Sequence, residues 1–184
     1  MRSRAFLATI TVYHIWAAKA RLFWGKGGRN VKKNVRIIIL LLALAWCVLI
    51  WHFSLASGAE SADTSGDVLE FINGILTRLG SENLFTHQTV RKIAHFVEFF
   101  ALGVLFAAVY FAFDFPHFVF FALPSVFAVA CVDEFIQRFS PDRTSAFLDV
   151  CLDFAGGTCG VMLFYLAFCL VFVLCQRKAK KVQK

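Results

Sequence analysis

The chain has 184 residues and a mass of 20.7 kDa; 59% of its residues are hydrophobic and only 17% are charged. A soluble domain of this size cannot bury so much apolar surface in one core, so the composition excludes soluble enzyme folds and predicts a membrane protein. The formal net charge of +7 does not indicate nucleic-acid binding, because the 19 Lys and Arg residues gather beside apolar segments in a pattern that reports membrane topology.

Residues 1–34 form a basic and aromatic segment that precedes the first long apolar run. Arg2, Arg4 and the apolar residues after them imitate a secretory signal peptide. Cleavage there would export five basic residues that stand directly before or at the start of a membrane span, against the usual charge bias. We therefore expect a helix that lies along the inner leaflet, with Trp16 and Trp24 among the lipid headgroups.

Four apolar runs are each long enough to cross a hydrocarbon core of about 30 Å, which takes about 20 helical residues. Backbone groups inside lipid must pair within their own segment, so each run is predicted as a helix. The runs cover residues 37–56, 93–113, 118–137 and 147–174. The predicted fold is therefore all-α, a four-helix transmembrane bundle within residues 35–176, followed by a basic cytoplasmic tail over 177–184.

The distribution of basic residues predicts the orientation of these spans. Nine Lys and Arg residues lie before or at the start of the first span and five follow the fourth, whereas three lie between the first two spans and two between the last two. The positive-inside rule then places both termini in the cytoplasm and both of those loops outside the cytoplasmic (inner) membrane. In the first outward loop, apolar residues at helical spacing from Val68 to Leu79 predict a short interfacial helix capped by Ser65.

Five acidic residues, one histidine and one glutamine interrupt the second, third and fourth spans. A charge at the bilayer centre costs about 2.5–3.5 kcal/mol on insertion scales, so such residues usually face a bundle interior or a cavity. They are His95 and Glu98 in the second span, Asp133, Glu134 and Gln137 in the third, and Asp149 and Asp153 in the fourth.

The predicted topology brings the acids of three spans to one level. A rise of about 1.5 Å per residue places Glu98, Asp133 and Asp153 about 6–9 Å below the outer boundary. On the fourth span, Asp149 and Asp153 share a face with Gly156 and Gly160, whose small size lets a neighbouring helix approach closely. We expect these faces to meet in one pocket that opens to the exterior.

Two neighbours of this cluster have alternative interpretations. Glu134 points about 100° away from Asp133 on a helix and is nearer to Arg138, so one of the two adjacent acids is expected to be paired or to reach the membrane surface. Arg143 lies in the short outward loop, which can hold its guanidinium over the cluster. In the alternative, Arg143 pairs with Asp149 or Glu134 and only stabilises the turn.

Four blocks of sequence occur in a fixed order. They are Phe53-Ser54 with the later Ser57, Ser61 and Ser65, then RKIAHFVEFFALG at 91–103, DEFIQRFSPDR at 133–143 and DVCLDFAG at 149–156. Together they resemble the VanZ-like family. The resemblance implies a small four-span bacterial membrane protein, in a family named after a member linked to teicoplanin resistance. The family pattern has Gln shortly after the Phe-Ser pair, Tyr at Phe99 and Asn at Asp153, so this chain carries one additional acid.

The cluster fits several functions, and the sequence favours a non-enzymatic one. In this hypothesis the outward pocket binds the headgroup of a cell-envelope lipid intermediate, a glycan or a glycopeptide-related ligand, and so affects teicoplanin susceptibility. The other expected partners are membrane lipids. The ligand-binding residues would be His95, Glu98, Asp133, Glu134, Gln137, Arg143, Asp149 and Asp153.

Two active alternatives and one structural alternative stay open. A membrane hydrolase or transferase acting on lipid-linked phosphate would hold a divalent cation on acids such as Asp133, Asp149 and Asp153. Its catalytic candidates are His95, Glu98, Asp133 and Glu134, although no HExxH or nucleophile-elbow motif is present. An ion-coupled transporter component is the second active alternative. The structural alternative is an ion network that only stabilises helix packing.

Overall fold

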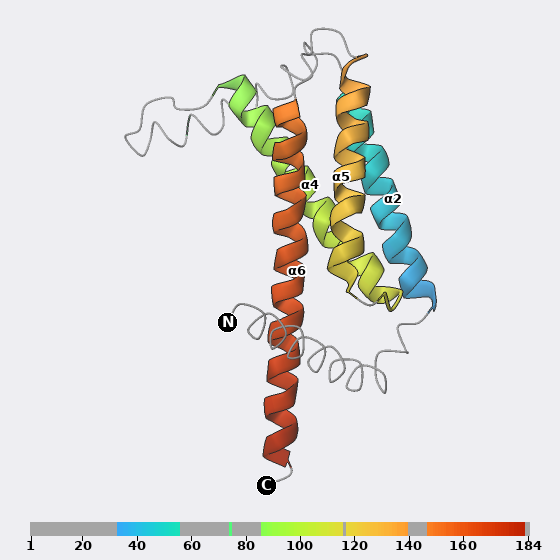
Figure 1. Ribbon diagram of the computed structural model, residues 1–184, viewed down its shortest axis with the longest axis vertical. Coiled ribbons are helices and arrows are strands. Elements are labelled where there is room, and N and C mark those ends of the chain that lie inside the picture. Colours follow the sequence, from blue (N-terminus) through green and yellow to red (C-terminus); the bar gives the residue numbers. More distant parts are fainter. Residues whose placement is uncertain (1–32, 56–73, 75–85, 116, 140–146, 183–184) are drawn as a thin grey trace, which may run out of the picture.

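A computed structural model describes residues 33–55, 74, 86–115, 117–139 and 147–182 (Figure 1). Four helices make up nearly all of this described part, and no strand occurs in it. They are α2 (Lys33–Leu55), α4 (His87–Ala112), α5 (Phe118–Gln137) and α6 (Phe147–Val182). Each is long and apolar enough to cross a membrane, so the all-α, four-span prediction is confirmed.

The helix bounds differ from the predicted spans mainly at polar ends. Helix α5 has the predicted bounds, whereas α4 begins at His87, earlier than expected, because the Thr86 hydroxyl caps its first turn by accepting a hydrogen bond from the Thr89 amide at 3.2 Å. Helix α6 continues through the basic segment to Val182, since Lys and Arg favour helix and suit its C-terminal end.

Three sequence predictions fall on residues outside the described ranges. These are the N-terminal interfacial helix, the short loop helix predicted from Val68 to Leu79, and the placement of Arg143. Of the loop helix, only Gly74 belongs to the described residues.

Helices α4 and α6 cross in close contact at glycine residues. An added Cβ on Gly103 would overlap the carbonyl group of Gly157, and one on Gly160 would overlap the carbonyl group of Phe100. The backbones of the two helices can touch only because these positions lack side chains. The predicted small-residue face of the fourth span is therefore a packing face, and its partner is α4.

The remaining surface of the bundle is strongly apolar. Large hydrophobic side chains such as Leu41, Phe120 and Leu166 are more than half exposed. Helices that are surrounded by lipid are expected to have such a surface. It supports the description of the chain as a multi-pass membrane protein.

The two ends of the bundle are marked by different contacts. At one end, Arg36 at the start of α2 forms an ion pair with Asp114 in the α4–α5 turn, with Nη2 and Oδ2 2.8 Å apart. Because α2 and α5 run opposite to α4 and α6, the end of α2, the start of α4, the end of α5 and the start of α6 meet at the other end (Figure 1). We call this second end the polar end.

Candidate functional site

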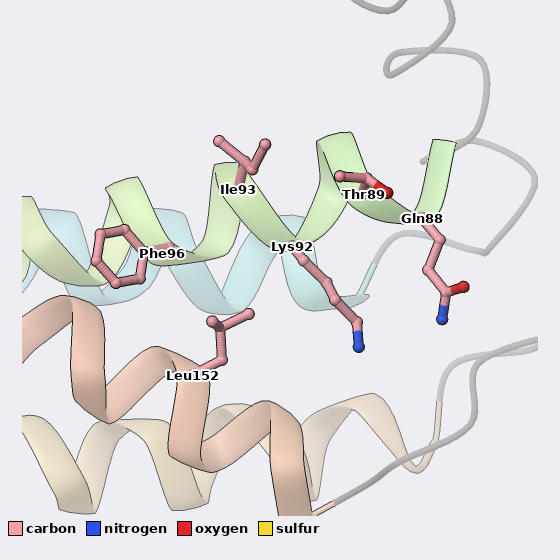
Figure 2. A pocket seen from close by; sticks show the side chains of 6 residues that line it. All are labelled: Gln88, Thr89, Lys92, Ile93, Phe96 and Leu152. Carbon is pink, nitrogen blue, oxygen red and sulfur yellow. The ribbon is translucent and has the colours of Figure 1, made fainter. Parts of the chain in front are cut away.

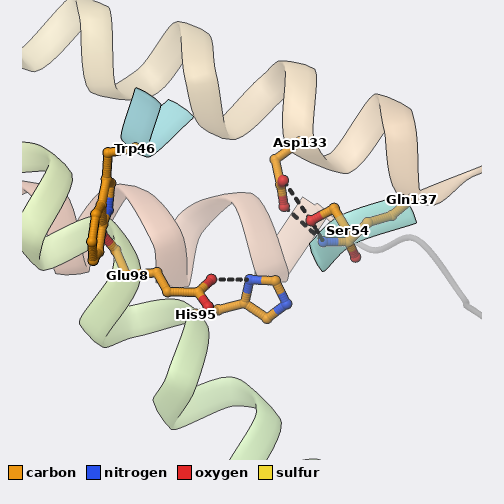
Figure 3. A network of polar contacts seen from close by, with 6 residues as sticks. All are labelled: Trp46, Ser54, His95, Glu98, Asp133 and Gln137. Atoms are coloured by element: carbon orange, nitrogen blue, oxygen red, sulfur yellow. Dashed lines mark hydrogen bonds and ion pairs between the residues drawn. The ribbon is translucent and has the colours of Figure 1, made fainter. Parts of the chain in front are cut away.

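Side chains from all four helices contribute to the polar end. Helix α2 supplies Ser54, α4 supplies His95 and Glu98, α5 supplies Asp133, Glu134 and Gln137, and α6 supplies Asp149 and Asp153. The sequence predicted that the acids of three helices would gather at one level, and the structure brings them to the same end of the bundle. Figure 3 shows the part of the group that surrounds Asp133 and His95.

Asp133 is the centre of a buried hydrogen-bond network. Its side chain is fully buried, and its Oδ1 accepts a hydrogen bond of 2.6 Å from the Ser54 hydroxyl. Its Oδ2 accepts a second hydrogen bond of 2.7 Å from the Gln137 amide, whose Nε2 also lies 3.5 Å from the Ser54 Oγ. Two donors from two helices therefore hold the Asp133 carboxylate in one orientation.

His95 and Glu98 lie one turn apart on α4 and face each other. The Nδ1 of His95 is 3.7 Å from Oε2 of Glu98, and both side chains are partly buried. The indole Nε1 of Trp46 on α2 donates a hydrogen bond of 3.0 Å to the backbone carbonyl of Glu98. This contact ties α2 to α4 at the level of the polar group (Figure 3).

Asp149 and Asp153 lie one turn apart on α6 but have different surroundings. Asp149 is partly exposed and its Oδ1 lies 3.5 Å from the Lys92 ammonium group. One alternative from the sequence paired Asp149 with Arg143. Among the described residues, the partner of Asp149 is Lys92 instead. Asp153 is only 2% exposed and makes no hydrogen bond or ion pair with the described residues.

The electrostatic surroundings of Asp153 are negative. The carboxylates of Asp133, Asp149, Glu134 and Glu98 all act on it through charge–charge interaction. A buried carboxylate surrounded by others is costly unless a proton or a cation compensates for its charge.

The two adjacent acids of α5 are both buried. Asp133 is 0% exposed and Glu134 is 6% exposed. The sequence left two alternatives for one of these acids, pairing or reaching the membrane surface, and the burial of both argues against the second.

Three of the polar side chains come close enough together to share an ion. A ligand atom from each of His95, Asp133 and Asp153 lies within 4.8 Å of the other two. The sequence hypothesis for a cation used Asp133, Asp149 and Asp153. The structure replaces Asp149 by His95 in the closely spaced set, since the Asp149 carboxylate lies beside Lys92.

An open groove of about 500 Å³ lies between α4 and α6 beside this group (Figure 2). Its lining residues are Gln88, Thr89, Lys92, Ile93, Phe96 and Leu152. The polar residues come from the first two turns of α4, and the apolar ones follow them on α4 or belong to α6. Lys92 belongs to the groove and also reaches Asp149.

The family model for VanZ/LLP1 matches residues 38–171, well over half of the chain. The chain belongs to this family. The predicted resemblance to VanZ-like proteins is thereby confirmed, and all the residues described at the polar end lie within the match. No curated protein and no solved structure matches the chain.

Sequence reasoning on this VanZ/LLP1 protein missed three contributors to the polar end. Ser54 appeared only as part of the Phe-Ser block, and neither Trp46 nor Lys92 was assigned a role. A serine in the last turn of an apolar span was a usable signal, since a buried hydroxyl requires a hydrogen-bond partner. The roles of Trp46 and Lys92 depend on the neighbouring helices and had no comparable signal.

Chemically, the polar end combines acceptors, a cation and one imidazole. The carboxylates can accept hydrogen bonds from sugar hydroxyls or amines, and Lys92 can bind a phosphate oxygen. The His95, Asp133 and Asp153 set also has the ligand types that transition-metal ions use. Among the described residues, the acids within the helices all lie at this end, and Asp114 is the one acid at the other end.

Proposed function

We propose that this VanZ/LLP1 protein binds the headgroup of an envelope lipid or lipid-linked glycan at its polar end. By doing so it affects susceptibility to glycopeptide antibiotics such as teicoplanin. One observation carries the proposal. Lys92 lines the open groove and also pairs with Asp149, so the groove and the acidic group lie next to each other.

The groove has the polarity gradient of an amphiphilic molecule. Phe96, Ile93 and Leu152 offer an apolar surface for a hydrocarbon chain, and Lys92 with Gln88 and Thr89 offers polar contacts nearer the beginning of α4 (Figure 2). A lipid that lay here with its chain between α4 and α6 would present its headgroup to the carboxylates.

The charge of Lys92 favours a headgroup that contains phosphate. Its side chain is 44% exposed, so the ammonium group can contact a ligand while it stays near Asp149. A phosphate would bind Lys92, while sugar hydroxyls or an amine on the same headgroup would donate to the acids. The loops at the polar end contain fewer Lys and Arg residues than the two termini. By the positive-inside rule, this supports a location of the polar end at the outer face of the cytoplasmic membrane.

The proposal is tested by filling the groove. Leu152→Trp places a large side chain in the groove, whereas Leu166→Trp makes the same change at an exposed position further along α6. We expect Leu152→Trp to weaken binding of polyprenyl phosphate to the purified protein in nanodiscs by about tenfold, equal to about 1.4 kcal/mol, with no change for Leu166→Trp. Teicoplanin susceptibility of cells that express equal amounts of each protein should follow the same order. Equal binding by both variants would contradict the proposal.

A second candidate function is hydrolysis or transfer at a lipid-linked phosphate. The observation that favours it is the close set of His95, Asp133 and Asp153, because a metal bound there could polarise a phosphoryl oxygen. Incubating purified protein with polyprenyl diphosphate and Mg²⁺, Mn²⁺ or Zn²⁺ tests it directly. Release of inorganic phosphate is expected under this function, and its absence with all three ions would argue against it.

A further inference from the structure

We infer that His95, Asp133 and Asp153 form a binding site for a divalent transition-metal ion of the Zn²⁺ type. The three ligands come from α4, α5 and α6, so the ion would join three helices at the polar end. This inference goes beyond headgroup binding and stands without it, because the ion would be bound by side chains of the protein alone.

The spacing of the three side chains fits one ion after a small adjustment. Their ligand atoms lie within 4.8 Å of one another. Neighbouring ligands of a four-coordinate Zn²⁺ ion, with bonds of about 2.0–2.2 Å, lie about 3.3–3.6 Å apart. Side-chain rotation that closes the set by about 1–1.5 Å would complete the site, and three protein ligands leave a fourth position open.

Asp153 provides an independent observation that points to a cation. The residue is only 2% exposed, yet no hydrogen bond or ion pair joins its carboxylate to the other described residues. Its charged neighbours are other carboxylates. A metal ion bound beside it would supply the positive charge that this position lacks.

The other two ligands are oriented in the way that metal ligands usually are. Ser54 and Gln137 each donate a hydrogen bond to a different oxygen of Asp133, which fixes the orientation of its carboxylate. Glu98 lies 3.7 Å from one ring nitrogen of His95. Hydrogen-bonded carboxylates and carboxylate-supported histidines are the common outer contacts of a metal site.

The ligand types select the class of ion. Imidazole favours zinc and other transition metals, whereas Mg²⁺ and Ca²⁺ prefer oxygen ligands only. A set of one histidine and two aspartates therefore favours Zn²⁺, and Co²⁺ can replace it as a spectroscopic probe.

The test uses the full chain, purified in detergent without a polyhistidine tag and stripped with a chelator. Titration with Zn²⁺ should give about one tightly bound ion per chain, and Co²⁺ should give visible absorption bands. We expect His95→Gln and Asp153→Asn to weaken Zn²⁺ binding by at least about 100-fold, because each removes one of three ligands. Ser125→Ala on α5, where the Ser125 hydroxyl contacts Tyr110 away from this cluster, should bind Zn²⁺ as the wild type does.

Several results would overturn the inference. One is the absence of Zn²⁺ binding by the wild type, and another is equal binding by the wild type, His95→Gln and Asp153→Asn. Loss of binding in Asp149→Asn alone would assign the ion to the set of acids predicted from sequence instead. Zinc-edge X-ray absorption of the wild type supplies a measurement that does not depend on variant folding, since it must show one imidazole and otherwise oxygen ligands.

Discussion

The two ends of the helix bundle are held together by different kinds of contact. At the α4–α5 turn, Phe111 packs edge-to-face against Phe118, Phe164 and Phe168, with ring centroids 5.3–6.0 Å apart. At the polar end, the central contact is the hydrogen-bond network of Asp133. One end is therefore stabilised by ring packing, and the other by directional polar contacts.

This difference separates the part of the bundle that builds the fold from the part suited to binding. Aromatic packing buries large areas and tolerates small shifts, because dispersion has little directional preference. A buried polar network gains little net stability and becomes costly when one partner is lost. A protein that retains a buried acidic network beside a groove is expected to use that end for recognition.

The largest expected effect comes from the glycine crossing that connects the two ends. Gly103→Ala would push a methyl group into the Gly157 carbonyl, so α4 and α6 must separate, and we expect a loss of about 3 kcal/mol or more in the free energy of unfolding. The measurement is membrane abundance together with thermal unfolding in detergent. Gly74→Ala is the matched control, since its new Cβ would meet no atom of the described residues within 4 Å.

A serine-to-alanine pair compares the ends directly. Ser54→Ala removes a donor to the buried Asp133, and we expect a loss of about 1–3 kcal/mol. Ser125→Ala at the other end removes the partner of the Tyr110 hydroxyl, 2.7 Å away and partly buried, at an expected cost of about 0.5–1.5 kcal/mol. Chemical denaturation in detergent measures both. Equal losses would show that the polar end is no more sensitive than the aromatic end.

Loss of ring packing should reduce stability without reducing binding. Phe118→Leu removes edge-to-face contacts with Phe111, Phe164 and Phe168, and we expect a cost of about 1–2 kcal/mol. Binding of polyprenyl phosphate should be unchanged at a temperature where the variant is folded. A loss of binding as large as that of Leu152→Trp would mean that the two ends are coupled.

The smallest effect is expected at the ion pair near the α4–α5 turn. The Asp114 side chain is 49% exposed and that of Arg36 is 23% exposed, so solvent weakens their attraction. We expect Arg36→Gln to change the free energy of unfolding by less than about 1 kcal/mol, with a smaller change at high salt. Chemical denaturation in detergent measures this change. A loss in the free energy of unfolding as large as that of Ser54→Ala would contradict this expectation.

The helices and the composition of the polar end were determined by local features of the sequence. The bounds of α5 agreed with its apolar run, because the requirement to pair backbone groups in lipid acts within one segment. Acids in three spans predicted a shared interior face for the same local reason, since each charge alone is costly in lipid. Family membership also followed from short blocks of adjacent residues.

Which of those residues meet was decided only by the tertiary structure. Helical periodicity gives the face on which Asp149 or His95 lies, but not the rotation and tilt of one helix against its neighbour. The glycine crossing of α4 and α6 places Lys92 beside Asp149 and leaves His95 close to Asp133 and Asp153. Ser54, Trp46 and Lys92 acquired their roles in the same way, because their partners come from helices far away in the sequence.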